Sequence, residues 1–294
     1  MLAKLAPVAS ETISSNFGTH RHWVASLDLG FSRSLANTRL ETMKFEGPLR
    51  VQRPFYPEED GTCHCYILHP PGGMVSGDRL SMQVNTAVDA RALVTTPSAG
   101  KVYGTDSHNL PQQQCISLSA DKDSSLEFLP QETIIFDSAR AELNTHIALT
   151  DNARLFYWDM ITLGRQAGDA PFKSGSFKQA LRIERDGLPL VLEHFDLQAG
   201  SALQHNAAGL MGYECFGSCY VSGNAIETQV EALREHLETL CGLDIFVTHK
   251  PDILIVRAMA HDTEILRNAF IRVWQCLRPL LLDKPAHEPR IWST

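Results

Sequence analysis

Residue types that bind metals in proteins gather between Cys63 and His69. Thiolate and imidazole groups are the usual ligands of tetrahedral zinc, so His64, Cys65 and His69 are candidate metal ligands. In a strand, however, successive side chains point to opposite faces, which separates His64 from Cys63 and Cys65. The C-x2-C spacing of structural zinc sites is also absent. These residues therefore favour the alternative interpretation, a strand with small buried thiols.

A loop rich in proline and glycine follows directly. Residues 69–78, with the sequence HPPGGMVSGD, combine two prolines with Gly72, Gly73 and Gly77. That composition fits neither a helix nor a strand, because these glycines supply backbone conformations that other residues avoid. We expect a tight loop that presents Asp78 at its end. No phosphate-binding loop or nucleophile elbow has this pattern.

Further acids lie in or beside apolar stretches. Asp159 directly follows the apolar residues 155–158, and Glu193 interrupts the strand-like segment 188–197. A buried carboxylate is costly unless it is paired or lines water. One interpretation is a polar passage, in which hard carboxylates pass a divalent cation without holding it tightly. The other is a set of structural ion pairs, with Arg140, Arg154 or Arg165 as candidate partners.

Motifs of common enzyme classes are missing. Residues 98–101, SAGK, lack the upstream glycine and the following Ser or Thr of a nucleotide-binding P-loop. None of the histidines forms an H-E-x-x-H pair, and no serine lies in a G-x-S-x-G turn. A nucleotide-hydrolysing enzyme is therefore not expected, and a hydrolase with its own metal or triad stays an alternative that no motif supports.

Alternation of apolar and polar residues dominates residues 23–261. Leu80, Met82 and Val84 alternate with polar residues, as in a strand with one buried face. About fifteen segments of this kind occur at the short spacing that is typical of all-β architectures. The body of the protein is therefore predicted to be mainly β, with many short strands.

Two helices are expected near the C-terminus. Asn224 and Glu227 resemble a capping box, and an apolar stripe then extends from Ile226 to Leu240. A second apolar stripe covers residues 262–277, and Pro279 is expected to stop that helix. No segment has the composition of a disordered linker, so residues 1–294 are expected to form a single domain.

Composition limits which binding partners and which cellular compartment are expected. The formal net charge of -8 makes nucleic acid an unexpected partner. No apolar run approaches the length of a membrane helix, and the first residues lack the apolar core of a secretory signal. Seven cysteines without framework spacing favour free thiols in a reducing compartment. These features predict a cytoplasmic protein.

Six stretches of the chain, in the same order, resemble the urease accessory proteins of the UreD family, which is called UreH in some organisms. Together they span nearly the whole sequence. They are residues 45–57, FEGPLRVQRPFYP; 69–79, HPPGGMVSGDR; 93–104, LVTTPSAGKVYG; 129–141, LPQETIIFDSARA; 158–165, WDMITLGR; and 289–292, PRIW.

The resemblance implies a chaperone that matures urease and is not an enzyme. Members of the family form a β-helical, superhelical body with two helices, bind the accessory protein UreF, recruit the GTPase UreG through it, and dock onto the urease structural subunits. It also implies a dimer of such heterotrimers, and nickel that is carried transiently rather than held as a tight cofactor.

An internal tunnel is the proposed nickel route in the family. Carried onto this sequence, its lining would include Asp78, Asp159 and Glu193, with Thr105 as a further candidate. The chain departs from the family after Arg165, where the family often has A-S-G-E-x-F and this chain has no Glu in register. Asp169, one position earlier, is a candidate substitute.

Two other functions compete with nickel delivery. One is a metal-dependent hydrolase that uses the cysteines and histidines of residues 63–69. The other is an interaction module whose effect on urease is only conformational, acting through the C-terminal helices.

Overall fold

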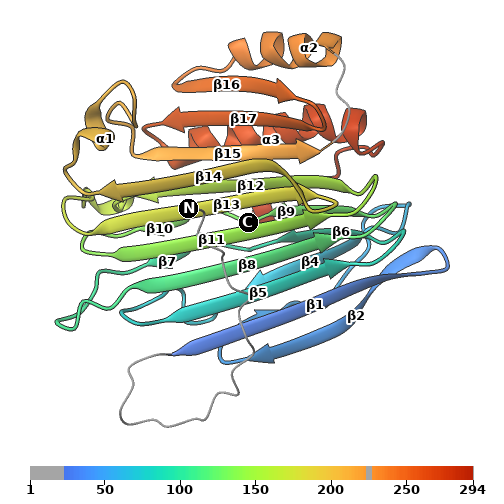
Figure 1. Cartoon of the computed structure of the whole chain (residues 1–294), viewed down its shortest axis with the longest axis horizontal. Helices are drawn as coiled ribbons and strands as arrows, with labels where there is room; N and C mark the ends of the chain where they lie inside the picture. The colour runs from blue at the N-terminus through green and yellow to red at the C-terminus, as the bar shows by residue number, and fades with distance from the viewer. Residues whose placement is uncertain (1–22, 223–226, 294) are drawn as a thin grey trace.

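The computed structural model describes residues 23–222 and 227–293, and its body consists of two facing β-sheets (Figure 1). The first sheet has seven strands. In spatial order these are β14 (Leu188–Gln198), β13 (Ser176–Arg185), β11 (Arg140–Leu149), β8 (Gln112–Ala120), β5 (Arg79–Thr86), β1 (Val24–Ser34) and β2 (Asn37–Glu46).

The second sheet has ten strands. Eight follow one path: β16 (Leu243–Lys250), β17 (Ile253–Ala260), β15 (Cys215–Ser222), β12 (Arg154–Leu163), β9 (Ser125–Leu129), β6 (Arg91–Thr95), β4 (Cys63–Leu68) and β3 (Arg50–Val51). Two short strands branch from β12, namely β10 (Thr133–Ile135) and, beyond it, β7 (Gly100–Val102).

The chain winds between the two sheets as a β-helix does. From β4 to β13 the longer strands fall alternately in one sheet and the other, and neighbours within this part of each sheet are parallel. Their alternating apolar residues meet in one core between the sheets. The prediction of a mainly β, β-helical body is confirmed.

A narrow third side closes one flank of this coil. Met74 pairs with Val102, Val102 with Ile135, and Ile135 with Leu163, all in parallel register. All four side chains are buried, one from each successive turn of the chain. This ladder fixes the flank of the interior space that is described below.

Both predicted C-terminal helices are present on the outer side of the ten-stranded sheet. Helix α3 (Thr263–Leu281) packs on β12, β15 and β17, while α2 (Glu227–Glu238) packs on α3 and β16. The predicted start of α2 at Asn224 and Ile226 lies outside the described residues. A second core fills the space between α3 and the sheet. Shorter helical turns are α1 (Ala202–His205), η1 (Gln166–Gly168) and η2 (Arg290–Ser293).

The expected stop at Pro279 is wrong. Helix α3 begins after its cap residue Asp262, whose carboxylate accepts hydrogen bonds from the next backbone N–H groups, but it continues past Pro279 to Leu281. Pro279 removes one backbone donor within the last turn. Leu281 and Leu282 are buried against the second core, and this packing outweighs the lost hydrogen bond.

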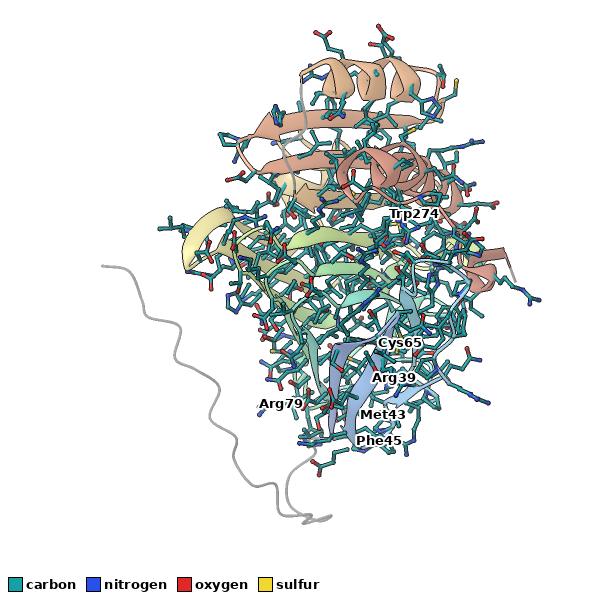
Figure 2. The ribbon with its side chains drawn as sticks, turned by 90° about the vertical axis from the view of Figure 1, so that its right-hand side faces the viewer. Arg39, Met43, Phe45, Cys65, Arg79 and Trp274 are labelled. Carbon is teal, nitrogen blue, oxygen red and sulfur yellow. The ribbon has the colours of Figure 1, made fainter. Side chains whose placement is uncertain are left out.

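The strands and helices are stacked along one direction of the molecule. Figure 2 shows Trp274 of α3 toward the end that carries the helices, and Met43 and Phe45 of β2 at the opposite end. Among residues 23–222 and 227–293, no helix combines the length and the hydropathy needed to cross a bilayer.

Candidate functional site

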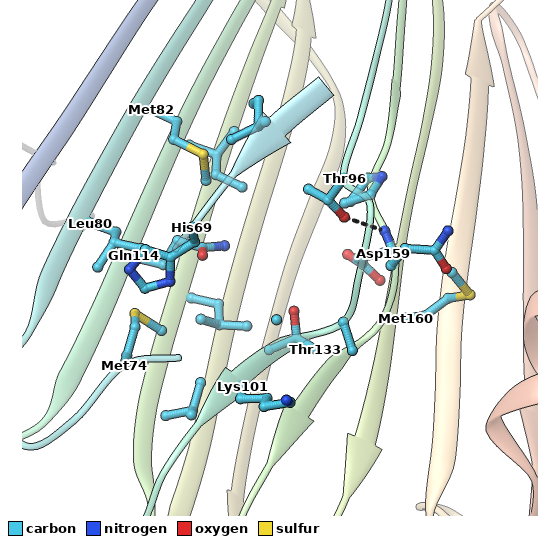
Figure 3. A pocket seen from close by; sticks show the side chains of 18 of the residues that line it. His69, Met74, Leu80, Met82, Thr96, Lys101, Gln114, Thr133, Asp159 and Met160 are labelled. Atoms are coloured by element: carbon cyan, nitrogen blue, oxygen red, sulfur yellow. Dashed lines mark hydrogen bonds between the residues drawn. The ribbon is translucent and has the colours of Figure 1, made fainter. Parts of the chain in front are cut away.

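An interior cavity lies between the two sheets, beside the ladder that begins with Met74. Its volume is about 130 Å³, and both sheets and the glycine-rich loop contribute to its lining. Figure 3 shows polar and sulfur-containing side chains pointing into it. The polar and sulfur-containing residues that line the cavity include His69, Met74, Met82, Thr96, Lys101, Gln114, Thr133, Tyr157, Asp159, Met160 and Gln179.

A second cavity of about 330 Å³ adjoins the first. Asp159 and Gln179 line both cavities, so the Asp159 carboxyl group lies where the two meet. The rest of the second lining comes from the end of the coil, on β13, β14 and β15: Leu181, Leu192, Glu193, His194, Phe195, Ser218 and Tyr220. The two cavities therefore share polar side chains from β12 and β13.

Strand periodicity explains why Asp159 faces these cavities. In β12, Leu155, Tyr157 and Ile161 point into the core between the sheets, while Phe156 and Trp158 point toward the helices. Asp159 is two residues from Tyr157 and two from Ile161, so its side chain points to the same face of the strand as theirs. A carboxyl group therefore occupies a position that is otherwise apolar along this strand.

Among residues 23–222 and 227–293, only neutral groups are placed to hydrogen-bond the Asp159 carboxyl. The Gln179 amide donates to its Oδ2 at 2.8 Å and the Tyr157 hydroxyl at 3.3 Å. Burial raises the pKa of Asp159 to about 7, and the nearby charge of Glu193 acts in the same direction. The Ser218 backbone N–H opposes this rise by stabilising the ionised form. Asp159 is thus poised to exchange a proton near neutral pH.

Glu193 has a different environment in β14. The Tyr220 hydroxyl donates to its Oε2 at 2.8 Å, and the Arg257 guanidinium forms an ion pair with its Oε1. Both partners of this pair remain partly exposed, at 32% for the Glu193 side chain and 44% for Arg257. Of the acids that the sequence singled out, the structure brings Asp159 and Glu193 to the same cavity.

Asp78 and Thr105 line neither cavity. The Asp78 carboxylate accepts a hydrogen bond from the Val75 backbone N–H at 2.8 Å and so braces its own loop, while burial raises its pKa. The Thr105 hydroxyl donates to the Ser138 carbonyl at 3.0 Å. Asp169 is exposed at the end of η1.

The glycines of residues 69–78 hold the loop as composition predicted. Gly72 and Gly77 have φ values of +78° and +86°, which favour glycine. A Cβ atom on Gly73 would lie 2.5 Å from the Tyr103 ring. The loop can therefore pack closely against β7 only because residue 73 has no side chain. The loop thereby places His69 and Met74 in the cavity wall.

The candidate metal ligands do not form one cluster. In the described parts of the chain, no three His, Cys, Asp or Glu side chains are arranged to hold a metal ion. Cys65 faces the core between the sheets, whereas His64 points the other way, with its Nε2 2.6 Å from Glu58. Burial raises the pKa of both buried thiols, to about 11 for Cys63, and keeps them protonated. His69 alone reaches the cavity, and burial lowers its pKa, which leaves the imidazole neutral.

Sequence reasoning missed a buried charge network beneath α3. The Arg278 guanidinium contacts Glu127 at 2.8 Å and Glu58 at 2.7 Å, and all three side chains are at most 5% exposed. Lys284 donates to Thr62 and Ser125 and lies 3.6 Å from Asp60. The partners are far apart in sequence, so no local pattern could have found them. The expected partners Arg140 and Arg154 instead contact Asn109 and Asp283.

Comparison with known proteins gives the class of this chain. The family model described as UreD urease accessory protein matches residues 24–293. The urease accessory protein UreD of Saccharophagus degradans is 41% identical over 280 residues, which is 93% of this chain and 94% of that relative. The UreD protein of Pseudoalteromonas translucida is 40% identical over 285 residues, covering 95% and 94%.

These matches place the chain among the accessory proteins of urease maturation. Within that class it belongs to the UreD family, as the six motifs predicted.

Proposed function

We propose that this protein is a scaffold that passes nickel to apo-urease, and that the two adjoining cavities form a polar route for it through the interior. The observation that carries the proposal is the position of Asp159, a carboxyl group shared by two adjoining cavities and hydrogen-bonded by neutral groups. Membership of the UreD family supplies the link to urease maturation.

The donor set suits transfer better than storage. Carboxylate and amide oxygens bind divalent cations through few, exchangeable contacts, whereas closed cages of Cys and His retain them. Asp159, Gln179 and Glu193 supply oxygen donors, and the buried thiols of Cys63 and Cys65 face a different part of the core. Nickel is therefore cargo in this proposal, with no tightly bound cofactor and no reaction catalysed by the chain itself.

We further propose that it works as part of an assembly. UreF, the GTPase UreG and the urease structural subunits are the partners expected of a UreD protein, in a dimer of heterotrimers. All seven cysteines are free thiols, which agrees with a reducing, cytoplasmic setting.

The first test is the nickel content of urease from cells that lack only this protein. We expect nickel-poor, inactive urease, and fully loaded enzyme would contradict the proposal. The second test replaces the chain by the double variant Asp159→Asn, Glu193→Gln, which keeps the shape of both side chains. Nickel per urease active site should then fall severely.

A matched control is Asp196→Asn, which removes an exposed carboxylate from the same strand as Glu193. It should leave nickel loading unchanged. Normal loading by the double variant would instead favour the competing idea, an interaction module that acts on urease only through its conformation.

A further inference from the structure

A row of three polar residues crosses the ten-stranded sheet where the coil ends. Asp159 of β12 pairs in register with Ser218 of β15, and Ser218 pairs with Arg257 of β17. These strands are neighbours in Figure 1, and β14 of the other sheet lies across from them. Because residues in one register row share a face, all three face the same side of the sheet as Tyr157 and Tyr220.

This row places the guanidinium of Arg257 next to the acids of the second cavity. Arg257 forms its ion pair with Glu193, which reaches across from β14 and also accepts from Tyr220. With this pair closed, the charge of Glu193 is neutralised, and Asp159 remains as the acid without an ion-pair partner among the described residues that line the cavity. With the pair open, two carboxyl groups from facing sheets would repel each other and favour a shared divalent cation.

Opening the pair is easy because both partners are partly exposed. Half-exposed ion pairs contribute little to stability, and their long side chains can rotate into solvent. Arg257 therefore differs from Arg278, whose guanidinium is buried and contacts two carboxylates. The exposed pair of Arg257 can therefore open and exchange partners, whereas the buried contacts of Arg278 stay closed.

We propose that Arg257 is a tethered competitor of the metal cargo: its guanidinium occupies Glu193, so that a divalent cation is held there only while Arg257 is displaced. This inference rests on the proposed function, because it assigns a control element to the same polar route. Arg257 is a positioning residue in this scheme, and it shortens the time for which the cation stays.

Direct binding of Ni²⁺ to the purified full-length chain tests the proposal. Equilibrium dialysis or calorimetry would compare the wild type with Arg257→Gln, a variant that keeps a polar side chain but removes the charge. We expect Arg257→Gln to bind Ni²⁺ about tenfold more tightly or better, since the cation no longer competes with a tethered one. Adding Glu193→Gln to this variant should abolish the gain.

The matched control is Arg182→Gln. Arg182 pairs with Glu184 on the outer face of the seven-stranded sheet, and it is 42% exposed, much as Arg257 is. Its loss should not change the affinity for Ni²⁺. If Arg257→Gln binds Ni²⁺ no more tightly than the wild type or Arg182→Gln, or if no variant binds it, the proposal is overturned.

Nickel loading of urease separates this inference from the proposed function. Tighter binding by Arg257→Gln together with normal loading by Asp159→Asn, Glu193→Gln would support competition by Arg257 but refute the route. Poor loading by that double variant without tighter binding by Arg257→Gln would support the route and refute the competitor.

Discussion

The molecule contains two groups of acids in its interior, and their surroundings differ in kind. Beneath α3, Glu127 accepts hydrogen bonds from Trp274 at 2.7 Å and from both Nε and Nη2 of Arg278. Between the sheets, Asp159 accepts from an amide and a hydroxyl and faces open space. The first acid is fully neutralised and enclosed, whereas the second has no such compensation.

This difference separates a structural carboxylate from a functional candidate. A buried charge that only holds the fold must be paired, since an unpaired one costs several kcal/mol. A carboxyl group that lines a cavity and has a pKa raised to about 7 retains part of that cost. Such uncompensated groups concentrate where a protein binds or transfers something.

Removing the cation from the enclosed group should produce the largest effect on stability. Arg278→Met fills a similar volume but leaves Glu127 and Glu58 buried without their cation. We expect a loss of roughly 3–5 kcal/mol in the free energy of unfolding, measured by denaturant titration. The exposed-pair variant Arg182→Gln should lose less than about 1 kcal/mol. A loss for Arg278→Met as small as that of the control would show that the network does not hold α3 in place.

The second test uses the pH dependence of stability at Asp159. Its folded pKa, about 7, lies above the unfolded value of 3.8, so the folded state binds the proton more tightly. The native state therefore loses stability as pH rises from about 4 to about 7. Asp159→Asn cannot ionise and should be more stable than the wild type at pH 8, by up to roughly 4 kcal/mol.

Unfolding free energies of the two proteins at pH 4 and pH 8 check this expectation. The advantage of Asp159→Asn should shrink to roughly 0.5 kcal/mol at pH 4, where the wild-type carboxyl is protonated in the folded state and about half protonated in the unfolded state. An equal difference at both pH values would mean that Asp159 is compensated in a way that its neutral neighbours do not reveal.

Sequence patterns predicted the strands, and they identified one of the two groups of acids, the group that contains Asp159. Alternation placed Leu80, Met82 and Val84 on a buried face, and all three are buried. Asp159 was recognisable because it follows an apolar run in a strand, a local signal that needs no knowledge of its partners. Its neighbour Gln179 was not recognisable, because only the parallel stacking of successive coils brings β13 beside that cavity.

The remaining features depend on contacts that sequence spacing does not encode. Glu127 and Arg278 are 151 positions apart, and their meeting depends on how α3 docks on the sheet. Pro279 misled the prediction of the helix end because propensity is local, whereas Leu281 gains burial from the same docking. Asp78 lies in a family motif and Thr105 directly follows one, yet their side chains form hydrogen bonds within or next to their own loops.

The smallest effect on the free energy of unfolding is expected at the Glu193–Arg257 pair. Measuring it tests directly whether this pair differs from the buried contacts of Arg278. Both partners are partly exposed, so Glu193→Gln should lower the free energy of unfolding by less than about 1 kcal/mol. A double-mutant cycle with Arg257→Gln measures the coupling between the two side chains directly. A coupling as large as that between Glu127 and Arg278 would mean that the pair is a fixed part of the fold. A small coupling, combined with a clear effect on nickel loading, would mean that Glu193 contributes to transfer far more than to stability.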